Sequence, residues 1–496
     1  MLLRRILSVV LLVLFTLTAS AQEWTAGRGC RRGTPRPEGL VMRRGAPDGQ
    51  PKQVGGDFYR GERHQLVVLA AFNDRAFKGD ADATMAQWNL IFNARNLTEA
   101  PFRGSVHDYF YAQSYGAFDL TFDLEYVKVK GNAVKYASDD DDDENSQYLV
   151  EDIMEVLSTR DIDWSLYDWN GDGFVNQLLI IYAGHGMNDT RGDNLIWPHQ
   201  WWMSDHLKDG QMGVYCDPIP VTYNDKEYKV DCYCALAELT KDNDYGSFGT
   251  ICHEYTHCFG FPDFYKSNTS YVGPSELMDN GNYNGDGYCP AGYSAHECWM
   301  MGWLTPTELS TTTTITNMPT LSDEPQAYLI RNDGHQDEYY VIENRQQIGW
   351  DAGLPGSGII IFHVDYDPDL WVSTIYYPNT YSNKHYIIIP ANNIPSASSY
   401  ICQDWTYPYN DNDSLTNNSV PPAVLNHENT DGTKLMNKSL HDMAVVGDLA
   451  SFRFVVSTPT GIQERKAEGA PKELYRMGPV GILRYPNGET KKVVKP

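Results

Sequence analysis

Basic side chains are scarce in this sequence relative to acidic ones. Its 496 residues include 39 lysines and arginines but 65 aspartates and glutamates, so the formal net charge is -26. Binding to nucleic acid depends on contacts between basic side chains and phosphates, and a chain this acidic is repelled by phosphate backbones. We therefore expect no nucleic-acid partner. Divalent cations, calcium in particular, suit such a chain better.

Several catalytic and structural motifs are also missing. There is no G-x-S-x-G element to support a serine nucleophile, and there is no glycine loop that could cradle a phosphate. The nine cysteines are odd in number, and Cys232 and Cys234 have no matching downstream pair, which excludes a four-cysteine zinc knuckle. No solenoid-type repeat is present. The pairing of the cysteines stays open.

Long apolar runs are confined to the N-terminus. Arg4 and Arg5 precede the apolar segment 6–17, and the small residues 19–21 offer a site for signal peptidase. An apolar core of about a dozen residues is too short to serve comfortably as a membrane anchor. We expect a signal peptide over residues 1–21, a secreted or cell-surface protein, and no stable membrane span in the mature chain.

The remaining sequence divides into four segments. Residues 22–57 are rich in glycine, arginine and proline and indicate a leader or short pro-segment. In residues 58–310, strand-like runs such as "HQLVVLAAF" alternate with segments that have helical spacing, which predicts an α+β (α/β) domain. Residues 311–456 hold strand-like runs between turns and predict an all-β, sandwich-like domain. Residues 457–496 form a basic linker and tail, in which we expect one or two short strands.

Two segments are candidates for binding calcium or another cation. Asp139–Glu144 is an uninterrupted acidic run, and it is either a solvated loop or a loose cation site. "DWNGDGFVNQ" begins like a calcium loop with Gly173 at the tight turn, but Leu179 replaces the bidentate glutamate of an EF-hand. Its candidate ligands are Asp168, Asn170, Asp172, Phe174 through its carbonyl, and Asn176. A hydrated Asx-rich turn is the alternative to calcium.

The clearest chemical motif is "GTICHEYTHCFGFPDFY", residues 249–265. His253 and His257 are four residues apart, so on a helix their imidazoles share one face and can bind one metal ion. Glu254 follows the first histidine, where its carboxylate can take a proton from a water that zinc has activated. A helix with two hydrogen-bonded structural histidines is the alternative for the bare pattern.

The motif extends beyond the two histidines to H-E-x-x-H-x-x-G-x-x-D. Gly260 allows a sharp turn out of the helix, and Asp263 can then return as a third ligand. Three protein ligands leave one position open, which is typical of catalytic zinc, whereas structural zinc usually has four protein ligands. The extended pattern therefore favours a catalytic zinc site.

Two downstream residues are candidates for supporting this site. Met278, in a turn after the third ligand, resembles the methionine of the Met-turn that lies beneath the zinc in metzincin-type peptidases. Tyr283 is the nearest tyrosine that could stabilise an oxyanion, and its spacing from Met278 differs from the short one of some metzincins. A tyrosine that only packs is the alternative at this position.

Taken together, the motifs resemble the immune inhibitor A-like family of secreted bacterial zinc metallopeptidases. The resemblance covers about residues 58–365, and its segments follow the family's order. They are "VVLAAFND" (67–74), "SVHDYFYAQSYGAFDL" (105–120), "DWNGDGFVNQLLIIYAGHG" (168–186), "IWPHQ" (196–200), "HEYTHCFGFPDFY" (253–265), "ELMDNGNYNG" (276–285), "PAGYSAHECWMMGWL" (290–304) and "YYVIENRQQIGWDAGLPGSGIIIFHVD" (339–365).

The resemblance implies a metzincin-like fold and endopeptidase activity on proteins or peptides. It implies zinc on His253, His257 and Asp263, with Glu254 as the general base. A catalytically retired surface adhesin or binding protein that keeps a structural metal is the alternative function. The leader is short for an inhibitory prodomain, so we also consider Cys30 as a thiolate cap on the zinc. The C-terminal tail is similar to tails exported by the type IX secretion route, which would make secretion machinery a partner.

Overall fold

The computed structural model describes most of the chain from Phe58 onward. The described residues are 58–137, 145–190, 195–246, 248–266, 269–371, 377–380, 382–395, 402–456, 472–477, 480–484 and 490–494. The predicted signal peptide, leader and Cys30, and the whole acidic run Asp139–Glu144, lie outside the described residues. The chain forms two units, one that ends at Val455 and one over Val456–Pro496.

A mixed five-stranded sheet forms the frame of the first unit. Its strands, in spatial order, are β2 (Phe118–Lys128), β1 (Gly61–Ala71), β4 (Leu178–His185), β8 (Cys232–Leu239) and β5 (His199–Trp202). The first four pair in parallel, whereas β5 pairs antiparallel with β8 and forms an edge. Residues 66–71 of β1 are buried on both sides, as expected for a parallel strand that is covered on both faces.

Three helices predicted from the sequence are present beside this sheet. They are α1 (Ala81–Asn93), α2 (Val106–Gln113) and α3 (Ser146–Leu157). Helix α2 begins with a capping box, in which the Ser105 side chain accepts from the Asp108 backbone and the Asp108 side chain accepts from the Ser105 backbone. Local sequence alone therefore accounts for where this helix begins.

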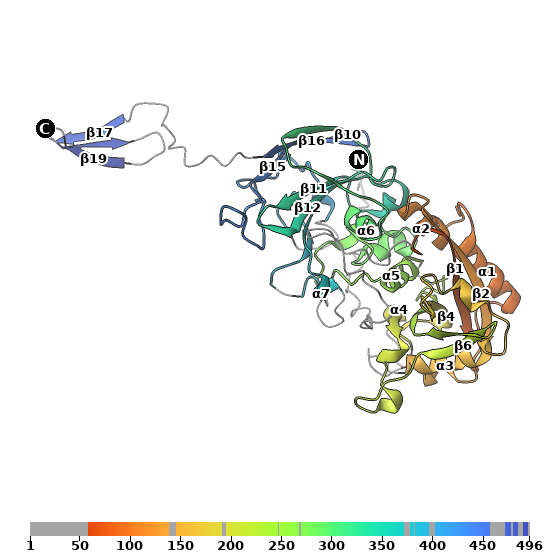
Figure 1. Ribbon diagram of the computed structural model, residues 1–496. Coiled ribbons are helices and arrows are strands. Elements are labelled where there is room, and N and C mark those ends of the chain that lie inside the picture. Colours follow the sequence, from red (N-terminus) through yellow and green to blue (C-terminus); the bar gives the residue numbers. More distant parts are fainter. Residues whose placement is uncertain are drawn as a thin grey trace, which may run out of the picture. The chain divides into compact units, whose positions relative to one another are not determined.

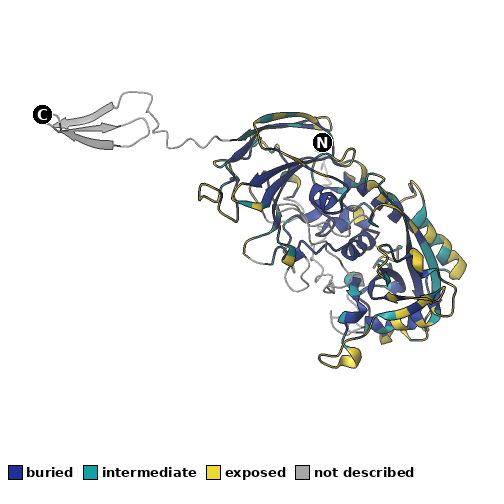
Figure 2. Ribbon diagram, viewed as in Figure 1, coloured by how far each residue is buried: buried dark blue, intermediate teal, exposed yellow. Residues whose placement is uncertain are grey.

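Helix α5 (Phe248–Cys258) lies at the centre of the first unit and is buried along its whole length (Figures 1 and 2). It contacts β8, β5, α2 and the 3₁₀ segment Gly281–Gly287. A Cβ on Gly249 would lie 1.8 Å from the carbonyl oxygen of Asn282, so only glycine permits this close approach. The short helix α6 (Ala295–Met300) follows in sequence.

Strands dominate the chain after residue 304, as the sequence predicts. One sheet contains, in order, β14 (Tyr386–Ile388), β13 (Gly358–Asp365), β12 (His335–Arg345), β11 (Tyr328–Asn332) and β9 (Thr307–Glu308). A second contains β10 (Thr313–Met318), β16 (Leu449–Val456) and β15 (Lys438–Val446). The remaining short elements of the first unit are β3 (Phe174–Val175), β6 (Ile219–Tyr223), β7 (Lys226–Val230), α4 (Met187–Thr190) and α7 (Pro368–Trp371). The domain boundary at residue 310 and the sandwich arrangement stay predictions.

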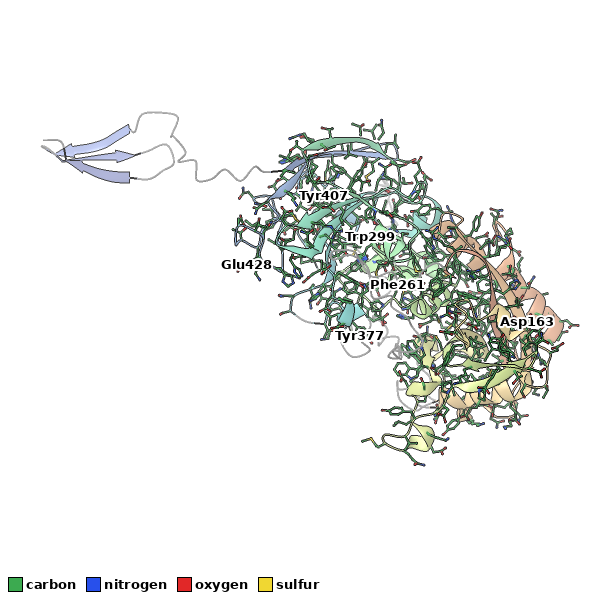
Figure 3. The ribbon with its side chains drawn as sticks, viewed as in Figure 1. Asp163, Phe261, Trp299, Tyr377, Tyr407 and Glu428 are labelled. Atoms are coloured by element: carbon green, nitrogen blue, oxygen red, sulfur yellow. The ribbon has the colours of Figure 1, made fainter. Side chains whose placement is uncertain are left out.

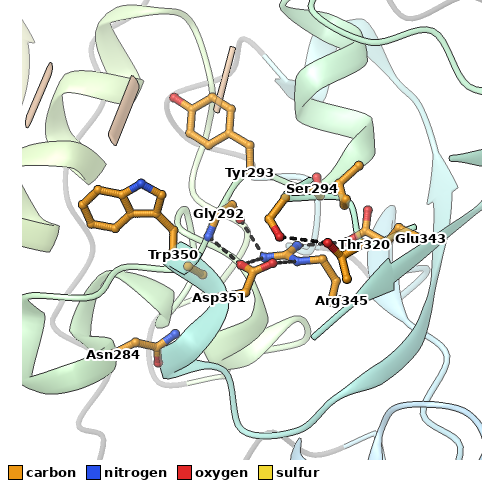
Figure 4. A network of polar contacts seen from close by, with 12 residues as sticks. Asn284, Gly292, Tyr293, Ser294, Thr320, Glu343, Arg345, Trp350 and Asp351 are labelled. Atoms are coloured by element: carbon orange, nitrogen blue, oxygen red, sulfur yellow. Dashed lines mark hydrogen bonds and ion pairs between the residues drawn. The ribbon is translucent and has the colours of Figure 1, made fainter. Parts of the chain in front are cut away.

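A buried ionic network joins the region before residue 304 to the strands after it (Figure 4). The Arg345 guanidinium donates to Asp351 at 2.5 and 2.6 Å, to Glu343 at 2.9 Å and to the Gly292 carbonyl at 3.0 Å. Glu343 in turn accepts from the backbone N–H of Ala295 at 2.7 Å. Two carboxylates and a carbonyl satisfy the buried cation, so the network fixes α6 against β12.

The second unit contains a small antiparallel sheet. Its strands are β17 (Lys472–Met477), β18 (Val480–Arg484) and β19 (Thr490–Val494). The basic tail thus contains three strands rather than the one or two expected. Among the described residues, no helix combines the length and the apolar character that a membrane crossing requires.

Candidate metal centre

Three side chains of the H-E-x-x-H-x-x-G-x-x-D motif converge in the core of the first unit. His253 and His257 lie one turn apart on α5, and their Nε2 atoms are 3.2 and 3.4 Å from Oδ1 of Asp263. All three side chains are buried. Gly260 has a φ of 102°, so glycine makes the turn that brings Asp263 back to the helix, as the sequence predicts.

Backbone carbonyls fix how the two imidazoles face this point. Nδ1 of His253 donates to the Leu277 carbonyl at 2.8 Å, and Nδ1 of His257 donates to the Phe261 carbonyl at 2.7 Å. Each ring therefore has its Nε2 lone pair turned toward Asp263. Such second-sphere hydrogen bonds are what orient metal-binding histidines in proteins.

The donor atoms of this group fit a zinc ion. The two Nε2 atoms and both carboxylate oxygens of Asp263 are buried and have no hydrogen-bond partner. One atom from each residue lies within 4.8 Å of the others. Buried polar atoms are normally satisfied, and two imidazole nitrogens with one carboxylate oxygen are a donor set that zinc accepts. His253, His257 and Asp263 would hold the ion.

The electrostatics of the group also favour a cation. Burial alone would lower the pKa of His253, but the carboxylates of Asp263 and Glu254 outweigh it and raise that pKa to about 9. Burial likewise opposes ionisation of Asp263, yet the neighbouring imidazoles, His257 first, lower the pKa of its carboxyl group. The negative potential that attracts a proton to His253 equally attracts a metal ion.

A pocket opens onto this group, and Glu254 lines it together with His253. The other lining residues are Asn188, Trp197, Pro198, Thr250, Tyr265, Asp279, Asn280, Asn282 and Tyr283. Glu254 is itself fully buried on α5, one residue from the first histidine. The candidate base and one candidate metal ligand, His253, therefore line the same pocket, as does the candidate Tyr283.

Met278 lies in a turn that contacts both segments of the metal group. The carbonyl of the preceding residue, Leu277, accepts from His253, and the Met278 carbonyl accepts from the backbone N–H of Phe264 at 2.9 Å. The Met278 N–H donates to the buried Glu276 carboxylate at 2.6 Å. The role of Met278 in a Met-turn stays a prediction.

Sequence reasoning missed several pocket residues, Asp279 and Trp197 among them. Oδ2 of Asp279 accepts from Ser270 Oγ at 2.8 Å and from the backbone N–H groups of residues 271–273 at 3.0 to 3.2 Å. Burial raises the pKa of Asp279 to about 6, although these hydrogen bonds oppose the shift. The carboxyl next to the Met-turn was a signal that could have been used. Trp197 was visible only as part of the "IWPHQ" resemblance.

The predicted calcium loop is a tight turn with internal hydrogen bonds. Asp168 accepts from the Gly173 N–H at 3.1 Å, Asp172 from the Phe174 N–H at 2.8 Å, and Asn176 from the Trp169 N–H at 2.6 Å. The Asp172 bond, to the N–H two residues later, is of the Asx-turn type, which was the alternative to calcium. Calcium on this loop stays a prediction.

Two other contacts bear on the calcium loop. Nδ2 of Asn170 donates to Asp172 at 2.8 Å, and the Lys226 ammonium lies 3.6 Å from Oδ2 of Asp168. Oδ1 of Asp168 is nevertheless buried without a hydrogen-bond partner. A cation would compete with Lys226 for this carboxylate.

The cysteines beside the histidines face the core and not the metal group. Cys252 is fully buried, and burial raises the pKa of its thiol well above the usual range. The Cys258 thiol lies within hydrogen-bonding reach of Cys232 and Cys234 on β8, and burial also raises its pKa. Neutral buried thiols of this kind act as small apolar groups that pack α5 on the sheet.

Comparison with known proteins finds similarity over the region that contains this metal group. Residues 69–304 match the family model described as "Immune inhibitor A peptidase M6, catalytic domain". The chain is 27% identical over 220 residues to immune inhibitor A of Bacillus thuringiensis subsp. alesti, which covers 38% of this chain and 30% of that protein. It is 24% identical over 210 residues to the pre-pro-metalloprotease PrtV of Vibrio cholerae serotype O1, strain M66-2, which covers 36% of this chain and 21% of that protein.

The chain thus spans less than a third of the length of these curated relatives. Within the matched region stand α5 with its two histidines, Glu254, Asp263 and the Met278 turn. Residues 69–304 therefore belong to the immune inhibitor A peptidase M6 family, as its catalytic domain.

Proposed function

We propose that this protein is a zinc-dependent endopeptidase that hydrolyses peptide bonds of proteins. One observation carries the proposal: two imidazole Nε2 atoms and the Asp263 carboxylate converge beside a pocket that His253 and Glu254 line. A structural zinc site would use four protein ligands and would not need a carboxylate beside an open cavity. Family membership of residues 69–304 supports the same assignment.

In this proposal His253, His257 and Asp263 hold the zinc ion, and Glu254 performs the proton transfers. Bound zinc would supply Lewis-acid activation of water and of the scissile carbonyl. Glu254 takes the proton of the attacking water and passes it to the departing amine. Tyr283, on the wall of the same pocket, donates a hydrogen bond from its hydroxyl to the oxyanion of the tetrahedral intermediate.

The peptide substrate would lie along the edge strand β5. Trp197 and Pro198 line the pocket and directly precede this strand, whose other side pairs with no described strand. An extended peptide can add to such an edge through main-chain hydrogen bonds, which suits an enzyme that reads many sequences. The pocket beside it would then receive one substrate side chain.

Further parts of the proposal concern the chain outside the pocket. Residues 1–21 direct export, so the mature protein is secreted or held at the cell surface. The metzincin-like fold of the catalytic domain and the sandwich-like β region belong to the same proposal, as do calcium on the 168–176 loop and a role of the tail in secretion. Removal of the leader 22–57 would release a Cys30 thiolate if it caps the zinc.

The test compares Glu254→Ala with Glu227→Ala, an exposed glutamate of β7. Casein hydrolysis and zinc content are measured for the mature chain, with and without a chelator. We expect Glu254→Ala to keep its zinc and its fold but to lose cleavage, and Glu227→Ala to behave like the parent chain. Chelator-sensitive cleavage by Glu254→Ala would refute the assignment. A parent chain that binds zinc yet cleaves no protein would favour the retired binding protein.

A further inference from the structure

A second group of two histidines and one aspartate lies in the β-rich region after residue 304. His335 is the first residue of β12, Asp365 is the last residue of β13, and His427 belongs to a loop. One ligand atom from each residue lies within 4.8 Å of the others. The two strands are antiparallel neighbours, so the start of β12 lies beside the end of β13.

The two imidazoles face the same carboxylate oxygen. Nε2 of His427 is 3.2 Å and Nε2 of His335 is 4.0 Å from Oδ1 of Asp365. The other oxygen, Oδ2, accepts from Nδ2 of Asn426 at 2.9 Å and is 3.5 Å from Nδ1 of His385. Asp365 is therefore held through one oxygen and presents the other to both histidines.

The position of His427 is fixed by a buried glutamate. Glu338 of β12 accepts from the backbone N–H groups of Asn426 and His427, the latter at 3.0 Å. It also accepts from Nδ2 of Asn332 at 2.9 Å and contacts Nε2 of His363 at 2.7 Å. The loop is thus attached to the sheet independently of any ligand, and preorganised support of this kind is what metal sites require.

Exposure and ring geometry also suit a bound ion at the protein surface. The side chains of His335 and His427 are 40% and 47% exposed, whereas that of Asp365 is 4% exposed. The two rings lie against each other in a tilted arrangement, with centroids 3.9 Å apart and an interplanar angle of 34°. An ion there would have three protein ligands and an open side toward solvent.

This group is distinct from the metal centre on α5. In Figure 3 the label of Glu428, the neighbour of His427, lies well apart from that of Phe261, whose carbonyl orients His257. The pocket that Glu254 lines contains none of the three residues. Glu428 follows His427 in the sequence, as Glu254 follows His253, but Glu428 is exposed whereas Glu254 is buried and lines a pocket.

We propose that His335, His427 and Asp365 form a second binding site for Zn²⁺ or a divalent ion of similar preference. Two imidazole nitrogens and one carboxylate oxygen are the donors such ions select, whereas Ca²⁺ and Mg²⁺ prefer oxygen alone. The ion would join the loop that carries His427 to the ends of β12 and β13. Its role is to stabilise this region, and the site does not depend on the proposed peptidase activity.

The test measures Zn²⁺ bound per chain at micromolar free Zn²⁺ for the full chain and for His335→Ala, His427→Ala and His441→Ala. His441 lies on β15 outside both groups and is the matched control. We expect each of the first two variants to bind one zinc ion fewer than the parent, and His441→Ala to bind as many. Equal zinc content in all four chains, or binding only at millimolar Zn²⁺, would overturn the proposal.

A second measurement examines this site separately from the metal centre on α5. In a His257→Ala background, zinc should still raise the melting temperature, and adding His427→Ala should remove that rise. Should the His257→Ala chain not fold, the comparison of the single variants decides alone. Casein cleavage is followed in parallel, because His427→Ala should cleave like the parent. A parent that cleaves nothing but loses one zinc with His427→Ala would contradict only the peptidase proposal.

Discussion

The first unit contains two groups with the same three donors, and they differ in everything around those donors. His253, His257 and Asp263 are buried, and His253 lines a pocket together with the buried Glu254. His335 and His427 are half exposed, and the group lies at the end of two strands. The comparison teaches that the donor set indicates a metal, whereas the cavity and the adjacent base indicate catalysis.

The two groups are also built by different means. In the first, both histidines come from one helix, and a glycine turn returns the aspartate within the same segment. In the second, strand pairing and a loop held by Glu338 bring the three residues together. A helix fixes the spacing of its own residues, whereas a site made from a loop depends on the contacts of that loop.

The largest difference should appear when one histidine of each group is removed. His257→Ala should lower the kcat/KM for a casein-derived peptide by at least about 10³-fold, because it removes a metal ligand next to the general base. His427→Ala should leave kcat/KM within about twofold, since it borders no part of the pocket. Peptide hydrolysis at a fixed zinc concentration measures both. A comparable loss in both variants would mean that the two groups are not functionally separate.

Loss of Arg345 should affect the first group more than the second. Arg345→Met leaves Glu343 and Asp351 buried without their cation, which costs about 3 to 5 kcal/mol of stability. The Glu343 carboxylate also accepts a hydrogen bond from the backbone N–H of Ala295 at the start of α6. Loss of the Arg345 side chain should therefore destabilise the part of the first unit that contains the pocket. Urea unfolding measures the stability, and zinc titration of the folded variant then checks the second group.

The Arg345 prediction needs a control variant that removes an ion pair without leaving a buried charge unpaired. Arg453→Met serves, because Arg453 and its partner Asp442 are exposed on neighbouring strands of the other sheet. An exposed pair contributes at most about 1 kcal/mol. Equal destabilisation by the two variants would show that the buried network does not hold the region together.

The sequence predicts the first group because its residues lie close together in one segment of the chain. The i,i+4 spacing of His253 and His257 and the left-handed conformation of Gly260 follow from residues within one segment. The order of strands and helices up to β8 was also readable, because buried parallel strands are continuous apolar runs. The extended motif added Asp263, and the likeness to a Met-turn added Met278; the structure places both beside the helix.

The second group was not readable from the sequence, because no local pattern links its members. His335, Asp365 and His427 lie far apart in the chain, and only the pairing of β12 with β13 and the Glu338 contacts join them. The same reason explains why the Arg345 network was missed, although its residues lie within a recognised segment. Lys226 beside the predicted calcium loop comes from a strand that the loop's own residues could not reveal.

A smaller effect separates the two roles considered for Tyr283. If its hydroxyl stabilises the oxyanion, Tyr283→Phe should lower kcat by about 10²-fold with little change in KM. Tyr265, which lines the same pocket, provides the matched Tyr265→Phe control. Steady-state kinetics on one peptide gives both constants. An unchanged kcat in Tyr283→Phe would assign the residue to packing, and an equal loss in both variants would indicate a general effect on the pocket.

The smallest expected effect concerns pH and again belongs to the first group alone. Burial raises the pKa of Asp279 to about 6 from an ordinary value of 3.8, so the folded state holds a proton that the unfolded state has released. Stability from this group is therefore complete below pH 3.8 and is lost as the pH rises through about 6. Asp279→Asn should flatten this decline by no more than about 3 kcal/mol, since the amide oxygen can still accept from residues 270–273. Urea unfolding at several pH values measures it, with the exposed loop variant Asp411→Asn as control. A decline that persists in Asp279→Asn, or one that disappears in Asp411→Asn as well, would place the pH dependence outside the pocket.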